Sequence, residues 1–179
     1  MKTYTLNVAG LTRELPLCPV NETLDIAAFV MFSDVELTVA CASELLKKVP
    51  EFDVIVTAES KGIPIAYEAA RQSGKNYYVG RKGVKVYMTD PISVNVKSIT
   101  TLNVQTLCLS QEDVSHIKGK KVLIIDDVIS TGESLVALEK LVEKAGGIIT
   151  GKAAVLAEGD AADREDIIFL EKLPLFPKN

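Results

Sequence analysis

Two adjacent acids, Asp126 and Asp127, directly follow the apolar run 122–125. Two neighbouring negative charges beside a buried strand are costly unless a ligand uses them. Carboxylates can accept hydrogen bonds from the vicinal hydroxyls of a sugar, or hold Mg²⁺ through water. We therefore take this pair as the first candidate for a ligand site.

A short turn with hydroxyl side chains and one glycine follows the acids, ahead of a helix-like run over 133–147. The backbone N–H groups and the dipole at a helix N-terminus favour phosphate, and hydroxyls add donors. A helix cap at Ser130 or Thr131 is the plainer interpretation of such a turn alone. Next to two acids, the turn predicts a phosphorylated pentose. The turn consists of Ser130, Thr131, Gly132, Glu133 and Ser134.

Two further turns with charged side chains follow apolar runs. One contains Glu59, Ser60, Lys61 and Gly62, and the other is the basic stretch "GRKGVK". Alone, the first would be a solvated turn that caps a helix, and the second a solvated charged face. The dinucleotide fingerprint and the P-loop pattern are both absent. The cations of the basic stretch are Arg81, Lys82 and Lys85.

Apolar runs that alternate with helical patterns indicate the fold class. Such alternation is typical of an α/β protein with a mostly parallel central sheet flanked by helices. Ligands of these sheets lie outside the carboxyl ends of the strands, where all three turns fall. We expect strands at 53–58, 76–80, 120–127, 148–158 and 166–172, and helices at 37–49, 63–74 and 133–147.

Other segments predict additions to this sheet. Ser33 and Glu36 have the spacing of a capping box, which would start the first helix, and that helix should end near Pro50. The first twenty residues alternate like a strand or hairpin over the main body. The stretch from 81 to about 106 predicts a lid or hairpin excursion. We expect one domain over 1–179, with small N- and C-terminal additions.

Composition narrows the possible partners. A net charge of −4 and a pI near 5.1 argue against a nucleic-acid surface. No apolar run reaches the 18 residues that a membrane span needs. Cys18, Cys41 and Cys108 have no metal-site spacing, so we expect reduced thiols in a cytoplasmic protein. His116 is interpreted as a surface residue.

The stretch "VLIIDDVISTGES" resembles the signature of type I phosphoribosyltransferases, which bind 5-phosphoribosyl-1-pyrophosphate (PRPP) together with Mg²⁺. This resemblance places Asp126 and Asp127 at the ribose hydroxyls, with Mg²⁺ held indirectly through water or PRPP. It places the turn 130–134 at the 5′-phosphate.

The two other turns are also similar to segments of this family. "TAESKG" is similar to its pyrophosphate loop, which implies that Glu59, Ser60, Lys61 and Gly62 meet pyrophosphate. "GRKGVK" resembles a basic segment of the adenine enzymes, partly across a dimer interface, which implies a homodimer. The resemblance implies displacement at the anomeric carbon of ribose, in which a base nitrogen attacks while pyrophosphate leaves. The residues it implies in catalysis are Asp126, Asp127, Lys61 and Arg81.

The base is less clearly specified than the ribose phosphate. The order of the motifs most resembles adenine and related purine-salvage enzymes, with orotate enzymes second. Hypoxanthine–guanine enzymes commonly carry an acid where this chain has Ser130. Adenine enzymes usually carry an acid on the lid, whereas this chain has Thr101 or a neighbour there. Glu158 and Asp160 could recognise the base or lie in a charged surface loop. A regulatory protein that binds PRPP without catalysis is the alternative from another class.

Overall fold

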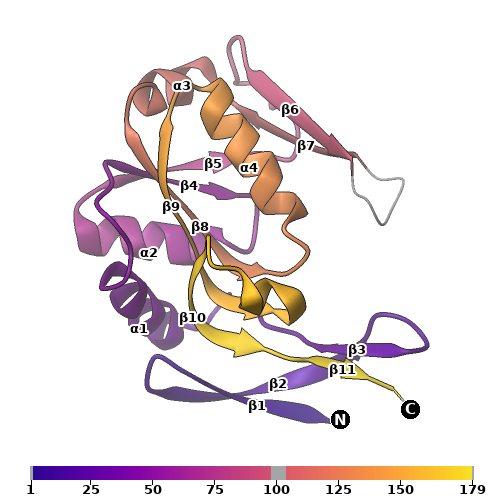
Figure 1. Cartoon of the computed structure of the whole chain (residues 1–179). Coiled ribbons are helices and arrows are strands. Elements are labelled where there is room, and N and C mark those ends of the chain that lie inside the picture. The colour runs from indigo at the N-terminus through magenta and orange to yellow at the C-terminus, as the bar shows by residue number, and fades with distance from the viewer. Residues whose placement is uncertain (1, 98–103, 179) are drawn as a thin grey trace.

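A central parallel sheet forms the body of the chain in the computed structural model, which describes residues 2–97 and 104–178 (Figure 1). Its strand order is β10-β9-β8-β4-β5, and every neighbouring pair is parallel. The predicted α/β fold is confirmed. The strands are β4 (Val54–Ala58), β5 (Asn76–Gly80), β8 (Lys121–Ile129), β9 (Ile148–Glu158) and β10 (Ile168–Leu173).

Helices cover both faces of this sheet, because successive side chains of a strand point to opposite faces. Leu123 and Ile125 of β8 pack with α1 (Val35–Leu46) and α2 (Ile63–Ser73) in one core. Val122 and Ile124 pack with α3 (Gln111–Ile117) and α4 (Glu133–Lys144) in a second core. The long apolar run before the acids is therefore buried on both sides.

A four-stranded antiparallel sheet joins the two ends of the chain below the main sheet in Figure 1. The predicted N-terminal hairpin and C-terminal addition thus form one structure. Its strand order is β1-β2-β3-β11, with β1 (Thr3–Val8), β2 (Leu11–Pro19), β3 (Leu24–Ala27) and β11 (Leu175–Pro177).

The predicted excursion is an antiparallel hairpin of β6 (Ile92–Lys97) and β7 (Val104–Leu109). It packs against α4, where Lys144 Nζ donates to the Ser93 carbonyl at 2.9 Å. Arg81 and Cys108 join its base to the end of β5 through two backbone hydrogen bonds of 2.9 Å. The lid position assigned to Thr101 lies outside the described residues.

The predicted Ser33–Glu36 capping box is wrong. Asp34 caps α1 instead, since its carboxylate accepts from the Leu37 N–H at 3.1 Å. Arg13 of β2 pairs with both Asp34 and Glu36, at 2.7 and 2.8 Å, and this draws Glu36 away from the helix start. The cation from a distant strand overrides the local pattern.

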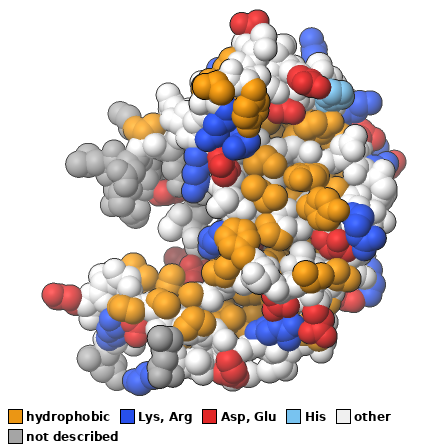
Figure 2. Space-filling view, turned by 180° about the vertical axis from the view of Figure 1, so that it is seen from behind, with side chains coloured by type: hydrophobic (Ala, Val, Ile, Leu, Met, Phe, Trp, Pro, Cys, Tyr) orange, Lys and Arg blue, Asp and Glu red, His pale blue; other side chains and the backbone are white. Residues whose placement is uncertain are grey.

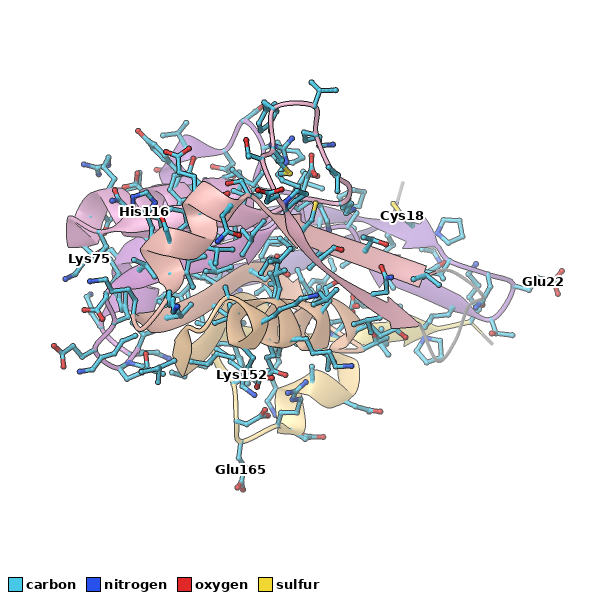
Figure 3. The ribbon with its side chains drawn as sticks, turned by 90° about the horizontal axis from the view of Figure 1, so that it is seen from above. Cys18, Glu22, Lys75, His116, Lys152 and Glu165 are labelled. Carbon is cyan, nitrogen blue, oxygen red and sulfur yellow. The ribbon has the colours of Figure 1, made fainter. Side chains whose placement is uncertain are left out.

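Helix α3 was not predicted, although its start carries a signal. Ser110 accepts from the Asp113 N–H at 3.1 Å, and acids fill the first turn. His116 on this helix is exposed (Figure 3). It stacks on Tyr78, and the two ring centroids are 5.8 Å apart. The three cysteines are free. No described helix is long and apolar enough to cross a membrane.

Candidate active site

The three predicted turns lie at the carboxyl ends of the neighbouring strands β4, β5 and β8. Residues from all three line one cavity of about 410 Å³. Figure 2 shows the molecular surface hollowed at its left edge, above the four-stranded sheet. The cavity is lined by Ala58, Glu59, Ser60, Lys61, Lys82, Asp126, Asp127, Val128 and Ser134.

The two acids lie near the end of β8, and both line the cavity. Asp127 is buried, with 3% of its surface exposed, and Asp126 is half-buried. The Asp127 N–H donates to Asp126 Oδ1 at 2.9 Å. Burial, followed by the negative charge of Asp127, raises the pKa of Asp126 to about 8. In the free protein the pair therefore carries less than two full charges at neutral pH.

Asp127 presents a carboxylate oxygen that a ligand could satisfy. Its Oδ2 is buried without a hydrogen bond, and Lys61 Nζ lies 3.4 Å away as an ion-pair partner. A buried acceptor without a donor is costly, so a ligand hydroxyl or hydrated cation would be favoured here. The described residues contain no cluster of three His, Cys, Asp or Glu ligands. Two acids fit Mg²⁺ that brings most of its oxygen ligands with a phosphorylated molecule.

Gly62 lets the turn after β4 pass directly beside the acids. A Cβ at this position would lie 2.4 Å from Thr57 Oγ1 and 2.6 Å from Asp126 Oδ1. Both distances are shorter than any contact between such atoms, so a side chain does not fit. The Glu59–Ser60 peptide bond in the same turn is cis. The glycine thus brings Lys61 to the carboxylates.

Glu59 organises the start of the basic segment. Its Oε2 accepts from the Lys82 N–H at 2.9 Å and pairs with Arg81 Nε at 3.2 Å. The Lys82 N–H and then the Arg81 guanidinium lower the pKa of Glu59. The structure thus separates the three cations that the sequence grouped: Lys82 lines the cavity, Arg81 is held by Glu59 and Tyr87, and Lys85 does not line the cavity.

The turn 130–134 leads into α4 through Gly132, which is the N-cap residue and has φ +81°. The alternative of a cap at Ser130 or Thr131 is not observed. Ser134 lines the main cavity with the acids. Arg164 was missed by the sequence: its Nη1 lies 2.7 Å from where a Cβ of residue 132 would stand, and no local pattern placed it there.

The hairpin borders the site from above. A cavity of about 220 Å³ beneath β7 shares Ala58, Glu59, Lys82 and Ser134 with the main cavity. Strand β7 thus lies over the side of the main cavity that carries Lys82. Its lining from the hairpin is Val104, Thr106 and Leu107.

A third cavity, of about 300 Å³, adjoins the main one on the side of the four-stranded sheet, and these two share Lys61 and Val128. Glu158, at the end of β9, lines it, whereas Asp160 is exposed in the 3-10 helix 159–163 and does not. Phe29 was not predicted as a site residue. The lining consists of Ile26, Ala27, Ala28, Phe29, Val30, Lys61, Val128, Ser130, Glu158 and Leu173.

Comparisons with known proteins identify a matching family and similar sequences. The family described as "Phosphoribosyl transferase domain" matches residues 40–173. An adenine phosphoribosyltransferase of Acetivibrio thermocellus is 34% identical over 150 residues, which are 82% of this chain and 84% of that protein.

Two other relatives are matched over 63% of this chain. The purine biosynthesis transcriptional repressor PurR of Bacillus subtilis is 32% identical, and a hypoxanthine/guanine phosphoribosyltransferase of Methanothermococcus okinawensis is 37% identical. The match spans less than two thirds of these relatives, namely 39% and 58% of their lengths.

Solved structures share the fold. The adenine phosphoribosyltransferase of Thermoanaerobacter pseudethanolicus superposes with a TM-score of 0.72, over 88% of this chain and 95% of that one, at 22% identity. The enzyme of Saccharomyces cerevisiae superposes with a TM-score of 0.70, over 88% and 93% of the two chains, at 20% identity.

Proposed function

Because the chain belongs to the phosphoribosyl transferase domain family, we propose that it is a purine phosphoribosyltransferase of nucleotide salvage. It transfers the 5-phosphoribosyl group from PRPP to a nucleobase, with adenine the leading candidate, and releases pyrophosphate. The observation that carries the proposal is the single cavity at which turns from β4, β5 and β8 meet Asp126 and Asp127. The adenine enzyme matched over 84% of its length supports the choice of base.

The ribose and its phosphate occupy the end of β8. Asp126 and Asp127 accept hydrogen bonds from the ribose hydroxyls, and Asp127 Oδ2 gains the donor that it lacks. The turn 130–134 holds the 5′-phosphate at the start of α4. Asp126 and Asp127 would hold Mg²⁺ indirectly when it binds with PRPP, and the ion would supply positive charge to pyrophosphate.

Pyrophosphate leaves on the side of the turn after β4. Lys61, beside Asp127, and Lys82, inside the cavity, are the side-chain cations placed to stabilise it, while Ser60 and Gly62 contribute the backbone of the loop. Arg81 joins them only when Glu59 releases it. Lys85 lies further along the same segment and would act at the rim or on a partner subunit.

The reaction is a displacement at the anomeric carbon. A ring nitrogen of the base forms the new bond to this carbon, and the carbon–oxygen bond to pyrophosphate breaks with its electron pair leaving on pyrophosphate. The ring nitrogen then gives its proton to solvent. Positive charge develops on the ribose, so positioning and charge stabilisation by the described residues account for the catalysis.

The exposed apolar residues of the surface support a homodimer. The free cysteines are consistent with the cytoplasm. Phe32, Val35, Val39 and Tyr67 are exposed around an apolar cavity of about 300 Å³, and Figure 2 shows hydrophobic side chains gathered on one face. Large exposed apolar patches mark association sites. Light scattering should therefore give twice the chain mass, and Val35→Lys should give the single mass.

A second candidate is a PRPP-binding regulator without transfer activity. The match to a transcriptional repressor favours it. An orotate phosphoribosyltransferase is the alternative with respect to the base. An assay that follows pyrophosphate release, with PRPP, Mg²⁺ and adenine, guanine, hypoxanthine, xanthine, orotate and uracil in turn, separates these candidates.

We expect release with a purine, and no release after Asp126→Asn with Asp127→Asn, which should also abolish PRPP binding. Tight PRPP binding without release for any base would favour the regulator. Unchanged PRPP affinity in the double variant would contradict the ribose contact.

A further inference from the structure

The cavity lined by Phe29 and Glu158 adjoins the ribose-phosphate cavity through two shared residues, Lys61 and Val128. A base that attacks the anomeric carbon must lie next to the ribose, so it needs a cavity that adjoins the ribose-phosphate site. Phe29 is buried in the cavity wall with 3% of its surface exposed. Given the proposed function, on which this inference rests, the cavity is the place for the base.

Most of the cavity wall is apolar, and only two of its side chains carry a charge, Lys61 and Glu158. Lys61 already pairs with Asp127. Glu158 ends β9, and the backbone of this strand pairs with β8 up to Ile129 and Ala157. It therefore stands beside Ser130, at the same edge of the sheet as the acids. The carboxylate is the charged acceptor available to a base in this wall.

We propose that Glu158 determines base specificity, by selecting nucleobases that present an exocyclic amino group over those that present an oxo group at the same position. A carboxylate accepts hydrogen bonds and donates none. An amino group donates to it, whereas an oxo group or an acidic substituent brings a second negative partial charge. The preferred class is the aminopurines, and this contact disfavours orotate.

The surroundings of Glu158 make this contact selective. Burial raises the pKa of the Glu158 carboxyl, and the charge of Lys61 opposes that rise. A partly buried carboxylate gains more from a donor, and loses more without one, than a solvated acid does. The contact thus depends on the donor that the base presents.

The test compares Glu158→Gln and Glu158→Lys with the unaltered protein. Glu165→Gln is the matched control, because Glu165 is exposed in the same loop and points away from the body of the molecule (Figure 3). Two quantities are measured: kcat/KM for adenine, guanine and hypoxanthine, and the Kd of AMP and IMP. The Kd of PRPP with Mg²⁺ checks that each variant is folded and keeps the ribose-phosphate site.

In the unaltered protein we expect a preference of roughly tenfold or more for adenine over hypoxanthine, and for AMP over IMP. Glu158→Gln should reduce this preference, and Glu158→Lys should reverse it, because lysine donates to an oxo group. PRPP affinity should change less than about threefold. Glu165→Gln should behave as the unaltered protein.

The inference is overturned if both Glu158 variants keep the adenine-to-hypoxanthine and AMP-to-IMP ratios of the unaltered protein. This outcome differs from failure of the proposed function, which would appear as no transfer to any base. In that case the AMP and IMP affinities still decide whether Glu158 selects the amino group. If neither nucleotide binds the unaltered protein, the inference fails as well.

Discussion

Gly62 and Asp126 approach each other so closely that a Cβ at position 62 would lie 2.6 Å from Asp126 Oδ1. The same Cβ would lie 2.4 Å from Thr57 Oγ1, whose side chain is fully buried. Gly62→Ala must therefore move either the loop or the acid. We expect a loss of transfer activity of roughly 100-fold, measured as kcat/KM for PRPP.

The same substitution should lower the free energy of unfolding by about 1–3 kcal/mol, because it overpacks a filled space. Chemical denaturation measures this change. Gly83→Ala is the stability control, since no atom lies within 4 Å of its Cβ position. If Gly62→Ala keeps full activity, the close approach of the loop to the acid has no functional role.

The raised pKa of Asp126 predicts a conflict between stability and function. An aspartate in the unfolded chain ionises near pH 3.8, whereas Asp126 in the folded protein keeps its proton until about pH 8. Between these values the folded state binds more protons, so its free energy of unfolding falls as pH rises. Asp126→Asn removes this loss.

We expect Asp126→Asn to be more stable than the unaltered protein by about 1–2 kcal/mol at pH 8, with little difference at pH 4. Denaturant midpoints at both pH values measure it. The variant should also fail to bind PRPP. If Asp126→Asn and the unaltered protein are equally stable at pH 8, ionisation of Asp126 does not lower the free energy of unfolding, and the prediction is wrong.

Binding of PRPP with Mg²⁺ should release protons near neutral pH. Cationic charge beside Asp126 lowers its pKa, and the carboxyl then loses the proton that it holds in the free protein. Calorimetry in two buffers of different ionisation enthalpy measures the number released. We expect the number of protons released to fall to zero well above pH 8. In Asp126→Asn no such release should occur.

Lys61 is the cation most directly coupled to the acids, at 3.4 Å from Asp127 Oδ2. Lys61→Met keeps an unbranched side chain of nearly the same length and removes its charge. We expect kcat to fall roughly 100-fold, as for the loss of one stabilising donor in a transition state. Lys75→Met is the control, because Lys75 lines a separate surface groove. A similar loss in both variants would indicate a general effect of charge.

The sequence predicted the parts of the site that are continuous with one strand end. Asp126, Asp127 and the turn 130–134 are contiguous, so the pattern of strand, acids and helix start was enough to place them. The turn with Lys61 joins them because parallel strands end at the same edge of a sheet. That relationship follows from topology and needs no tertiary contact to be known.

Other site residues depend on contacts between distant segments. Phe29 follows β3, which pairs with the last strand of the chain, β11, and no local pattern shows this pairing. Arg164 meets Gly132 across the loop that follows β9. The predicted capping box failed for the same reason, since Arg13 from another strand pairs with Asp34 and Glu36.

Substitution of Gly132 tests whether the turn 130–134 requires glycine for its backbone conformation or for the space that a Cβ would occupy. A Cβ there meets two obstacles: φ is +81°, and Arg164 Nη1 lies 2.7 Å away. The left-handed conformation costs an alanine about 1–2 kcal/mol. The guanidinium is the end of a flexible side chain, held by Asp166 through two hydrogen bonds of 2.9 and 2.7 Å, and it can shift. The backbone term should therefore dominate.

We expect Gly132→Ala to raise the KM for PRPP roughly tenfold, because a strained turn no longer aims its N–H groups at the phosphate. Removing the second obstacle in Gly132→Ala with Arg164→Ala should not restore the KM. Arg164→Ala alone is the matched control for the loss of the guanidinium. Recovery of the KM in the double variant would show instead that the clash with Arg164, rather than the backbone, limits this position.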